Sequence, residues 1–539
     1  MVLPIKRASI VAPATLFVAL SLVFAGSAFA ATENGNAEVM QAVHHDTLPS
    51  LRDTFPLVEQ FYKEPREHEL RQLPVHDRAG NGNDPVVQSL TNFVRAPTLG
   101  SSVDGVGQGF IGPQGTFVVN SAPPDSSGAV GATQYVQIVN QSLAVFDKST
   151  KTATYGPVAS QTLWSGFGGP CQTDNDGDAT AVYDRISGRW VISQFAVTAA
   201  PYYQCVAVSA TSDATGAYYR YAFSYGSVFP DYPKLGVWPD AYYTTFNMFN
   251  GNTFAGAKLC AYDRAMMLTG AAATQQCFQL STSFGGVLPS DQDGATAPPA
   301  GSPNYMMNFG SNSLNLWKFH VDWATPANSS LSARQTIPVA TFSTACGGGT
   351  CVTQSGVTQK LDSLGDRLMY RLAYRNFTGT GAHESLVVNH SVKVGTTKKN
   401  PYTGVRWYEI RSPGTTPVVF QQSTYAPDTN FRWMGSIAMD KLGDIAVGYS
   451  VSSSALRPAI RYTGRLSGDA LNTLQAETSI IEGTGSQSGS NLARWGDYSE
   501  MTIDPVDDCT FWYTTEYLKN TGAFNWSTRI ASFKFSGCQ

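Results

Sequence analysis

Two apolar runs separated by a short polar turn form a pattern that recurs along the chain from about residue 130 onward. In each copy, a run of β-branched and aromatic residues ends in Asp, a few turn-forming residues follow, and a second aromatic-rich run begins. Clear copies lie at residues 181–195, 436–449 and 501–513, and looser ones at 145–147 and 237–243. Because Asp, Gly and Pro supply turn geometry between strand-forming runs, each copy predicts a β-hairpin. Hairpins repeated every 50 residues or so, roughly, are typical of radial β architectures.

The repeats predict an all-β fold, a single β-propeller of about seven four-stranded blades. We expect the C-terminal strand, at residues 529–533, to close the last blade. Six or eight blades, or two β-sandwich domains, are the alternatives, since the spacing of the repeats is uneven. The expected blades centre on residues 130–160, 178–225, 232–280, 300–340, 360–411, 417–466 and 475–537.

The N-terminal part of the chain differs in pattern from the repeats. Residues 1–30 combine a basic start, an apolar stretch and a small-residue cleavage site, which predicts a signal peptide and a secreted or periplasmic protein. Residues 31–95 are more charged and predict an irregular or partly helical extension or pro-region, with a helix expected within 53–73. Residues 96–124 are rich in Gly, Ser and Pro and predict an extended linker into a propeller domain at 125–539. No later segment is apolar for long enough to predict a transmembrane helix.

Charge and cysteine content agree with an extracellular β-protein. Only 14% of the residues are charged and the formal net charge is −4, which argues against nucleic acid as a partner. The 8 cysteines are an even number after a signal peptide, which predicts disulfides. The sequence does not determine their connectivity. The simplest prediction pairs neighbours along the chain, as Cys171–Cys205, Cys260–Cys277, Cys346–Cys351 and Cys509–Cys538.

A second repeated feature is a short polar loop containing Gly or Pro, just before the expected first strand of several blades. In a propeller such loops gather at one mouth of the central channel, the usual place for a ligand on a concave scaffold. Plain turn-bracing by Asp side chains is the alternative for any single residue. The residues that we expect at this mouth are Asp125, Asp231, Lys234, Asp366, Arg367, Arg432, Trp433, Arg494, Trp495, Asp497 and Tyr498.

Three of these residues, Arg367, Arg432 and Arg494, come from separate blades and resemble the arginine cluster with which sialidases hold a substrate carboxylate. Two features of sialidases are not found. The Asp-box pattern is absent, and no Tyr–Glu nucleophile pair stands out, although Tyr498, Glu500, Tyr513 and Glu516 are candidates. A catalytic residue is therefore not assigned from the sequence.

The acidic loop at residues 174–178 carries carboxylates at alternate positions, in Asp174, Asp176 and Asp178. Hard oxygen ligands at this spacing suit calcium. The loop is not an EF-hand, because its Gly falls at the fourth position and the downstream Glu is missing. The sequence predicts calcium as the only cofactor, with a plain Asx-rich turn as the alternative.

The segments at residues 122–131 (APPDSSGAVG), 163–171 (LWSGFGGPC) and 494–499 (RWGDYS) resemble a group of secreted bacterial proteins of β-propeller type without an assigned activity. The resemblance covers about residues 95–539; it implies secretion and a propeller and transfers no catalytic residue. We therefore expect a monomer that binds a polysaccharide or an extracellular protein at the channel mouth. A polysaccharide-acting hydrolase or lyase is the first alternative, and a structural or adhesive surface protein is the second.

Overall fold

The computed structural model describes residue 1 and residues 35–57, 65–68, 71, 73, 84–88, 97–395, 402–489 and 492–539. The chain divides into two compact units, residues 1–31 and 32–539, and the second is the subject here. The expected signal peptide, apart from Met1, lies outside the described residues, as does part of the segment in which a helix was expected. Within the described ranges, no helix is long and apolar enough to cross a membrane.

The fold is all-β, as predicted, and is built from successive sheets whose strands follow one another along the chain. The strands, written from the first strand of each sheet outward, are β9 (Ser127–Val130), β10 (Gln134–Val139), β11 (Ser142–Asp147) and β12 (Ala153–Ala159); β13 (Thr180–Asp184), β14 (Arg189–Ala196), β15 (Tyr202–Ser209) and β16 (Tyr218–Gly226); β17 (Val228–Val237), β18 (Tyr242–Asn250), β19 (Thr253–Tyr262) and β20 (Thr274–Gln279); β21 (Leu288–Gln292), β22 (Asn304–Gly310) and β23 (Ser313–His320) with β24 (Ser330–Leu331) and β25 (Gln335–Pro338); β28 (Met369–Phe377), β29 (His383–Lys393), β30 (Thr403–Arg411) and β31 (Val418–Tyr425); β32 (Phe431–Met439), β33 (Ile445–Ser452), β34 (Ala459–Arg465) and β35 (Thr478–Ile481); and β36 (Glu500–Ile503), β37 (Phe511–Tyr517) and β38 (Ser527–Lys534).

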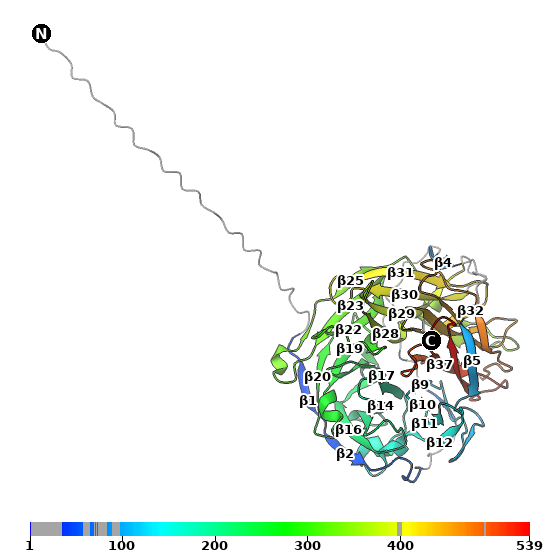
Figure 1. Ribbon diagram of the computed structural model, residues 1–539. Coiled ribbons are helices and arrows are strands. Elements are labelled where there is room, and N and C mark those ends of the chain that lie inside the picture. The colour runs from blue at the N-terminus through cyan, green and yellow to red at the C-terminus, as the bar shows by residue number, and fades with distance from the viewer. Residues whose placement is uncertain are drawn as a thin grey trace. The chain divides into compact units, whose positions relative to one another are not determined.

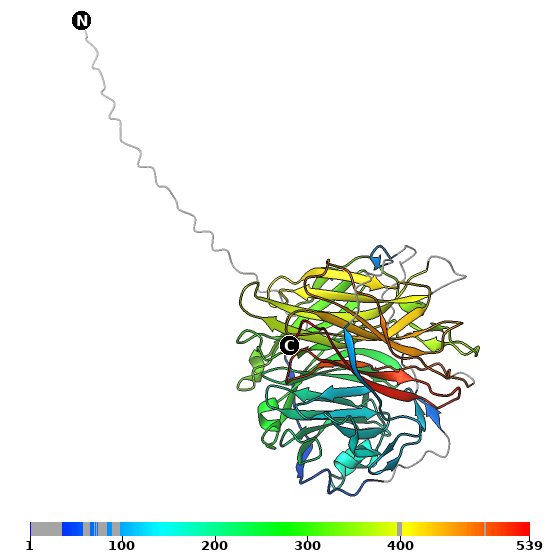
Figure 2. The ribbon, with the colours of Figure 1, turned by 45° about the vertical axis from the view of Figure 1, so that its right-hand side comes forward.

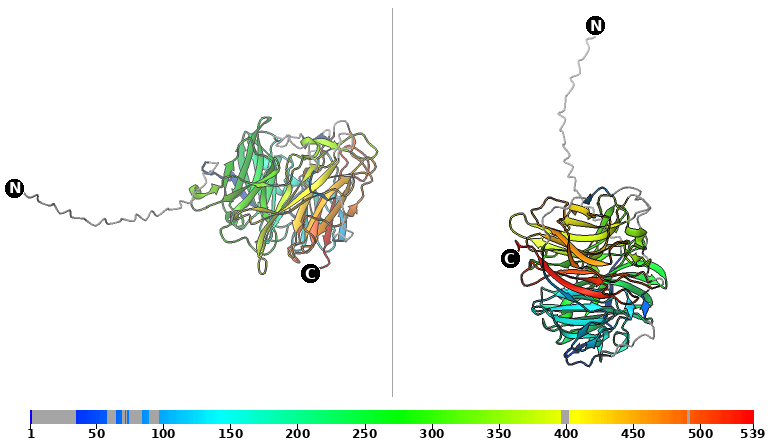
Figure 3. Two further views of the ribbon diagram at one scale, coloured as in Figure 1. Left: turned by 90° about the horizontal axis from the view of Figure 1, so that it is seen from above. Right: turned by 90° about the vertical axis from the view of Figure 1, so that its right-hand side faces the viewer.

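The first strands of these sheets contact one another in a closed circuit. β9 contacts β13, and the contacts continue through β17, β21, β28, β32 and β36 back to β9. Figure 1 shows β9, β17 and β28 toward the middle, with the last strands at the rim. In the right-hand view of Figure 3, the red C-terminal strands lie between the orange strands of the preceding sheet and the cyan strands of the first. Sheets arranged around a common centre define a β-propeller.

Both faces of the inner strands are buried, which explains their nearly continuous apolar sequence. In β14, Trp190 and Ile192 belong to a core cluster shared with Val136 of the preceding sheet, whereas Val191 belongs to one shared with Val237 of the next. Successive side chains of a strand point to opposite faces, so alternate residues fill the two gaps between neighbouring sheets. The core therefore lies between sheets rather than in one central layer.

The turn after the first strand is held by the Asp that ends each sequence repeat. In the second sheet, Asp184 Oδ1 accepts from the backbone N–H groups of Ile186 and Ser187, at 3.0 and 3.1 Å. In the sheet that begins with β32, Asp440 Oδ1 accepts from Leu442 N in the same way, at 2.8 Å. Such side-chain turns fix the hairpin locally. The hairpin Asp residues are thus architectural.

The N-terminal segments complete the outer edges of several sheets, so they are not an independent extension. β1 (Glu38–Gln41) pairs with β20 and β2 (His44–Leu48) with β16, while β4 (Val87–Gln88) pairs with β31. β5 (Thr98–Asp104) lies in the segment expected to be a linker and pairs with β38 (Figures 1 and 2). The C-terminal strand therefore lies inside the last sheet, and an N-terminal strand forms its edge.

A strand near the middle of the chain was assigned to the wrong blade by the sequence. The unit expected at 417–466 includes β31, but β31 pairs with β30 and is the fourth strand of the preceding sheet. The strand-forming pattern of β31 was correct; the pattern does not contain the hairpin to which a strand belongs. The remaining elements of the described residues are β3 (Arg66–Glu67), β6 (Ile111–Gly112), β7 (Gly115–Thr116), β8 (Ser121–Ala122), β26 (Thr350–Val352), β27 (Leu361–Asp362), α1 (Gly169–Thr173), α2 (Arg264–Met267) and 3-10 turns at Ser160–Trp164, Pro326–Asn328 and Ala345–Gly348.

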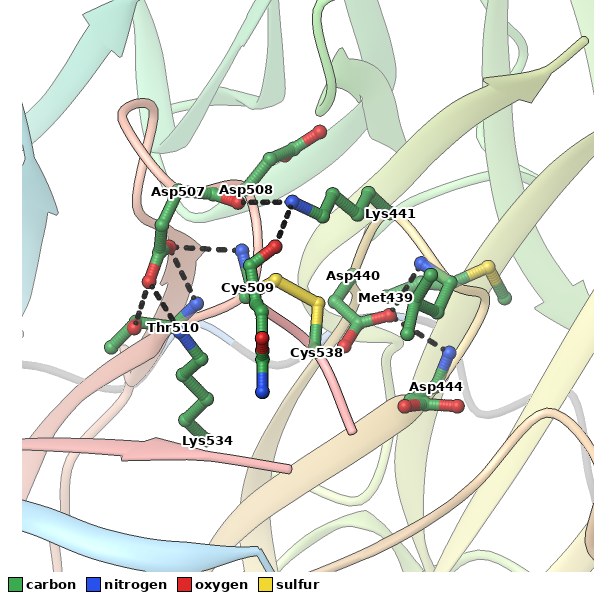
Figure 4. Close-up of a disulfide and its surroundings, with 12 residues drawn as sticks. Met439, Asp440, Lys441, Asp444, Asp507, Asp508, Cys509, Thr510, Lys534 and Cys538 are labelled. Carbon is green, nitrogen blue, oxygen red and sulfur yellow. Dashed lines mark hydrogen bonds and ion pairs between the residues drawn. A yellow bond between two sulfur atoms is a disulfide. The ribbon is translucent and has the colours of Figure 1, made fainter. Parts of the chain in front are cut away.

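All four predicted disulfides are confirmed, as Cys171–Cys205, Cys260–Cys277, Cys346–Cys351 and Cys509–Cys538. The last one joins the turn before β37 to the end of the chain after β38 (Figure 4). Lys441, from the turn between β32 and β33, contacts both parts. Its Nζ donates to the carbonyl of Asp507 at 3.1 Å and to that of Gln539 at 2.6 Å. The chain end is therefore tied to its own sheet and to the neighbouring one.

Candidate functional site

A cavity of about 390 Å³ lies where the loops that lead into the first strands meet, and we call it the mouth cavity. It unites side chains from segments more than 350 residues apart in the sequence, roughly speaking, as only closure of the sheets around a centre allows. The residues predicted from the sequence that line it are Asp125, Asp231, Arg367, Arg494 and Asp497, together with Asp176 and Asp178 of the acidic loop.

The loops around the mouth cavity share one backbone feature. Asp125, Asp178 and Asp497 have left-handed φ values of 47°, 46° and 56° just before their strands. Leu364 and Met434 have the same conformation, at 46° and 54°, but their side chains are buried in the core. Non-glycine residues adopt this conformation at a cost. The repeated turn is therefore part of the architecture, and the chemistry depends on which turns carry a carboxyl group.

Asp125 and Asp178 form a carboxyl pair beside the cavity. The two side chains share a hydrogen bond, so one of them carries a proton. Burial raises the pKa of both, and the charge of Asp178 raises that of Asp125 further. Tyr498 Oη donates to Asp178 Oδ2 at 3.0 Å, which stabilises the ionised form of Asp178. We assign the proton to Asp125 and the charge to Asp178.

A third carboxyl group, Asp231, extends this cluster. Burial, followed by the charge of Asp178, raises the pKa of Asp231 to about 7. Its strand, β17, has a register irregularity between Asp231 and Lys234, so the expected loop is a bulge inside the strand. A bulge of this kind re-aims side chains without ending a strand.

Lys234 is fully buried against the aromatic rings of the site. Its Nζ lies 3.3 Å from the ring centre of Tyr232 and 3.0 Å from that of Tyr498, and it donates to the carbonyl of Pro233 at 3.1 Å. Burial lowers the pKa of Lys234 well below its usual value, although Asp178 and Asp125 oppose this. Tyr232 lines the mouth cavity, so Lys234 lies directly behind its wall.

The two arginines of the cavity are each paired with a carboxylate. Arg367 Nε and Nη2 donate to Asp366 at 2.8 and 3.1 Å, and the guanidinium lies 4.5 Å from the ring centre of Tyr232. Arg494 forms an ion pair with Asp497. Neighbouring carboxylates raise the pKa of both arginines, so both stay charged. They are held in fixed positions as hydrogen-bond donors.

Three residues predicted for the mouth lie elsewhere, because the segment at 431–435 is not a loop but the first half of β32. Arg432 is buried and pairs with Asp428 and Glu477, through Nη1 and Nη2 at 2.8 Å each. Trp433 and Trp495 are buried and pack against each other with ring centres 5.8 Å apart. Only two of the three arginines of the expected sialidase-like cluster therefore reach the cavity.

The carboxylates of the acidic loop at 174–178 turn to separate partners. Asp174 accepts from the Thr173 hydroxyl, and Asp176 accepts from Val197 N at 2.6 Å and from Thr198 Oγ1 at 2.9 Å. Asp178 belongs to the carboxyl pair. Among the residues that the structure describes, no group of three or more His, Cys, Asp or Glu could hold a metal ion. This geometry does not fit a shared ligand set, and calcium binding stays a prediction.

Several cavity residues were missed by the sequence analysis. Arg66, Glu67, His68 and Arg71 come from the segment expected to be a separate extension. Phe229 comes from β17, which was expected to supply polar residues only. The extension carries no strand pattern that would connect it to the mouth. For Phe229, the aromatic run at 228–232 was the available signal.

Buried polar atoms without a hydrogen-bond partner gather at the cavity. Within the described part of the chain they include Oδ1 of Asp125, Oδ1 of Asp497, Nε of Arg494 and Nε2 of His68. Burial and the nearby Arg66 and Arg494 charges lower the pKa of His68 to about 3, so His68 is neutral. Buried polar groups are almost always paired in proteins, so a concentration of unpaired ones suits a polar ligand.

Comparison with known proteins gives no family. No family model matches the chain, and no curated protein matches it. Solved structures with a similar fold include the WD40 domain of SCAP from fission yeast, with 8% identity and a TM-score of 0.33 over 81% of this chain and 82% of that one. They also include an exo-β-1,3-galactanase from Phanerochaete chrysosporium, with 10% identity and a TM-score of 0.28 over 81% and 97%, and an ulvan lyase, with 11% and 0.32 over 81% and 97%. At these TM-scores the likenesses carry no argument about activity.

Proposed function

We propose that the protein is a secreted, seven-bladed β-propeller that binds a carbohydrate in the mouth cavity. The last blade is shared between the N-terminal strand β5 and the C-terminal strand β38. The observation that carries the proposal is that one cavity combines aromatic faces, fixed arginine donors, carboxyl groups and unpaired buried polar atoms. Sugars present hydroxyl groups at their edges and C–H groups on their faces, and this lining is complementary to both.

The size of the cavity favours a small ligand unit over a protein surface. About 390 Å³ lies at the lower end of the range of small-molecule sites, roughly 300–1,000 Å³, and holds one or two sugar rings. Phe195 and Phe229 line it beside the carboxyl cluster, so an aromatic platform and hydrogen-bonding groups are available to one ring. A protein partner would need a much larger surface.

The proposal is tested by binding to a panel of neutral and acidic oligosaccharides, measured by glycan array and calorimetry. We expect Phe229→Ala and Asp125→Asn to weaken binding at least tenfold, because the first removes a ring face and the second the proton that holds the carboxyl pair together. The matched control is Asp147→Asn, on an exposed turn remote from the cavity in the structure's first sheet. Wild-type binding that survives both cavity variants would place the ligand elsewhere.

Acid–base catalysis on the bound carbohydrate is the second candidate, and the Asp125–Asp178 pair favours it. A protonated carboxyl beside an ionised one, with Tyr498 donating to the latter, supplies an acid and a base at one place. A degradation screen that follows new reducing ends and the ultraviolet absorbance of unsaturated products distinguishes hydrolysis from elimination. We expect Asp178→Asn to abolish turnover and to leave binding within a few-fold of the wild type, whereas a pure binding protein gives no products.

A further inference from the structure

The described residues 65–68, 71 and 73, which we call the mouth strap, lie against the mouth cavity from one side to the other. At one end β3 pairs in parallel with β8, just before the first strand of the first sheet. At the other end Leu73 N donates to Asp366 Oδ2 at 3.4 Å, just before β28. Because β9 and β28 lie on opposite sides of the strand circuit, the mouth strap crosses the mouth.

The carboxylate of Glu67, in the mouth strap, is held as a bound anion would be. Its Oε1 accepts from the backbone N–H groups of Ala493 and Arg494, both at 2.9 Å. The Arg494 guanidinium donates through Nη1 to the carbonyl of His68 at 2.7 Å. Successive backbone N–H groups next to a guanidinium form a typical anion-binding arrangement.

The mouth strap also covers the aromatic face of the cavity. The guanidinium carbon of Arg71 lies 4.0 Å from the ring centre of Phe229, and Arg71 Nη1 donates to the carbonyl of Gly251 at 2.9 Å. The two features that would hold an acidic sugar, an anion position and a ring face, are therefore both occupied by side chains of the same short segment.

Most of the contacts that hold the mouth strap are polar and few. β3 contributes a two-residue pairing with β8, and the Arg66 side chain is 43% exposed. Leu73 is the exception, since it is buried beside Gly285 and Gly286. A ligand that offers a carboxylate and a sugar ring could therefore replace the contacts of Glu67 and Arg71 while Leu73 keeps the segment attached.

We propose that the mouth strap is an intrachain competitor for the cavity, and that the cavity's ligand is an anionic carbohydrate whose carboxylate takes the position of the Glu67 carboxylate. The inference rests on the proposed carbohydrate-binding function and adds the ligand class and a means of regulating access. A tethered competitor acts at high effective concentration, so it lowers the observed affinity without any second molecule.

The test compares the full-length mature wild type with Glu67→Gln and Glu67→Ala, using tetragalacturonate and cellotetraose as acidic and neutral probes in calorimetry. Glu38→Gln is the matched control, because Glu38 lies in β1 of the same N-terminal segment and pairs with Lys258 far along the blade edge. We expect both Glu67 variants to bind tetragalacturonate about tenfold more tightly than the wild type and the control, since a charge-assisted hydrogen bond no longer competes. Cellotetraose should gain less.

Hydrogen exchange at the amides of Ala493 and Arg494 gives a second measurement. We expect faster exchange in Glu67→Ala than in the wild type, and renewed protection when tetragalacturonate is added. Equal affinities in the wild type and both variants would overturn the competitor and leave carbohydrate binding intact. Binding of cellotetraose alone would overturn the anionic ligand class. Failure of every carbohydrate in every form would overturn the proposed function and this inference together.

Discussion

The Nζ atom of Lys234 lies 3.0 Å from the ring centre of Tyr498, and no water-exposed surface of the lysine remains. A protonated amine is attracted to a ring face, but removing it from water costs more than this attraction returns. The result is the lowered pKa of Lys234, and it explains how a lysine can lie beside the carboxyl cluster without neutralising it. The site is thus poised with its proton on Asp125 rather than on Lys234.

Lys234→Met should change the pH dependence of stability in a defined direction. The pKa of Lys234 is lowered in the folded chain and is about 10.4 in the unfolded chain, so between these values the unfolded state binds more protons. Raising the pH through this window should therefore stabilise the wild type relative to the variant. Denaturant unfolding at pH 7 and pH 9.5 measures the difference. Lys519→Met, whose wild-type side chain is 42% exposed, should show no such trend.

The sequence predicted the fold better than it predicted the site, and particular residues show why. The alternation of Trp190, Val191 and Ile192 reports burial on both faces of a strand, and turn residues such as Asp184 mark the hairpin ends. Both signals are local. Arg432 and Arg494 look alike in sequence, each beside a Trp and near a Gly, and what separates them is a bulged strand that directs Arg432 to Glu477.

Residues from the N-terminal segment were out of reach of the sequence for a related reason. Glu67 reaches the cavity through a two-residue pairing with β8 and through contacts with Ala493 and Arg494, more than 400 positions away, roughly, along a chain closed in a ring. Such a short pairing leaves no periodic pattern. The same holds for β5, whose partner β38 lies at the other end of the chain.

Asp231→Asn should gain stability relative to the wild type as the pH rises from 4 to 7. The pKa of Asp231 is raised to about 7 in the folded chain and is about 3.9 in the unfolded chain, so in this window the folded wild type binds more protons and loses stability as they leave. The Asn variant has no proton to lose. Denaturant midpoints at four pH values measure the trend.

Asp147→Asn is the control for this measurement. Hydrogen bonds from the hydroxyl of Ser149 and from Thr150 lower the pKa of Asp147 to about 2, so its effect changes only below pH 4. Its stability difference from the wild type should stay constant between pH 4 and 7. A parallel trend in both variants would contradict the assignment to Asp231.

Arg432→Gln should separate the architectural arginine from the arginines of the cavity. Breaking a buried ion pair typically costs about 3 kcal/mol, so the variant should unfold at lower denaturant concentration. Because Arg432 contacts Asp428 and Glu477 and not the cavity, the folded variant should bind carbohydrate as the wild type does. Arg494→Gln should weaken binding at least tenfold. Equal losses of binding in both variants would return Arg432 to the site.

Removal of the Cys509–Cys538 disulfide should destabilise the protein more than removal of Cys346–Cys351. The first pair closes a loop with a sequence separation of 29 and the second a loop with a separation of 5. Loop-closure entropy then assigns about 3.6 and 2.2 kcal/mol to the two links. The larger effect should be visible locally as well, because Cys538 follows β38, the strand that pairs with β5. Double Cys→Ser variants avoid free thiols; denaturant unfolding gives the costs, and hydrogen exchange reports on β38. Equal costs, or exchange in β38 unchanged by the loss of Cys509–Cys538, would show that the last sheet is held by its strand pairing and by Lys441 alone.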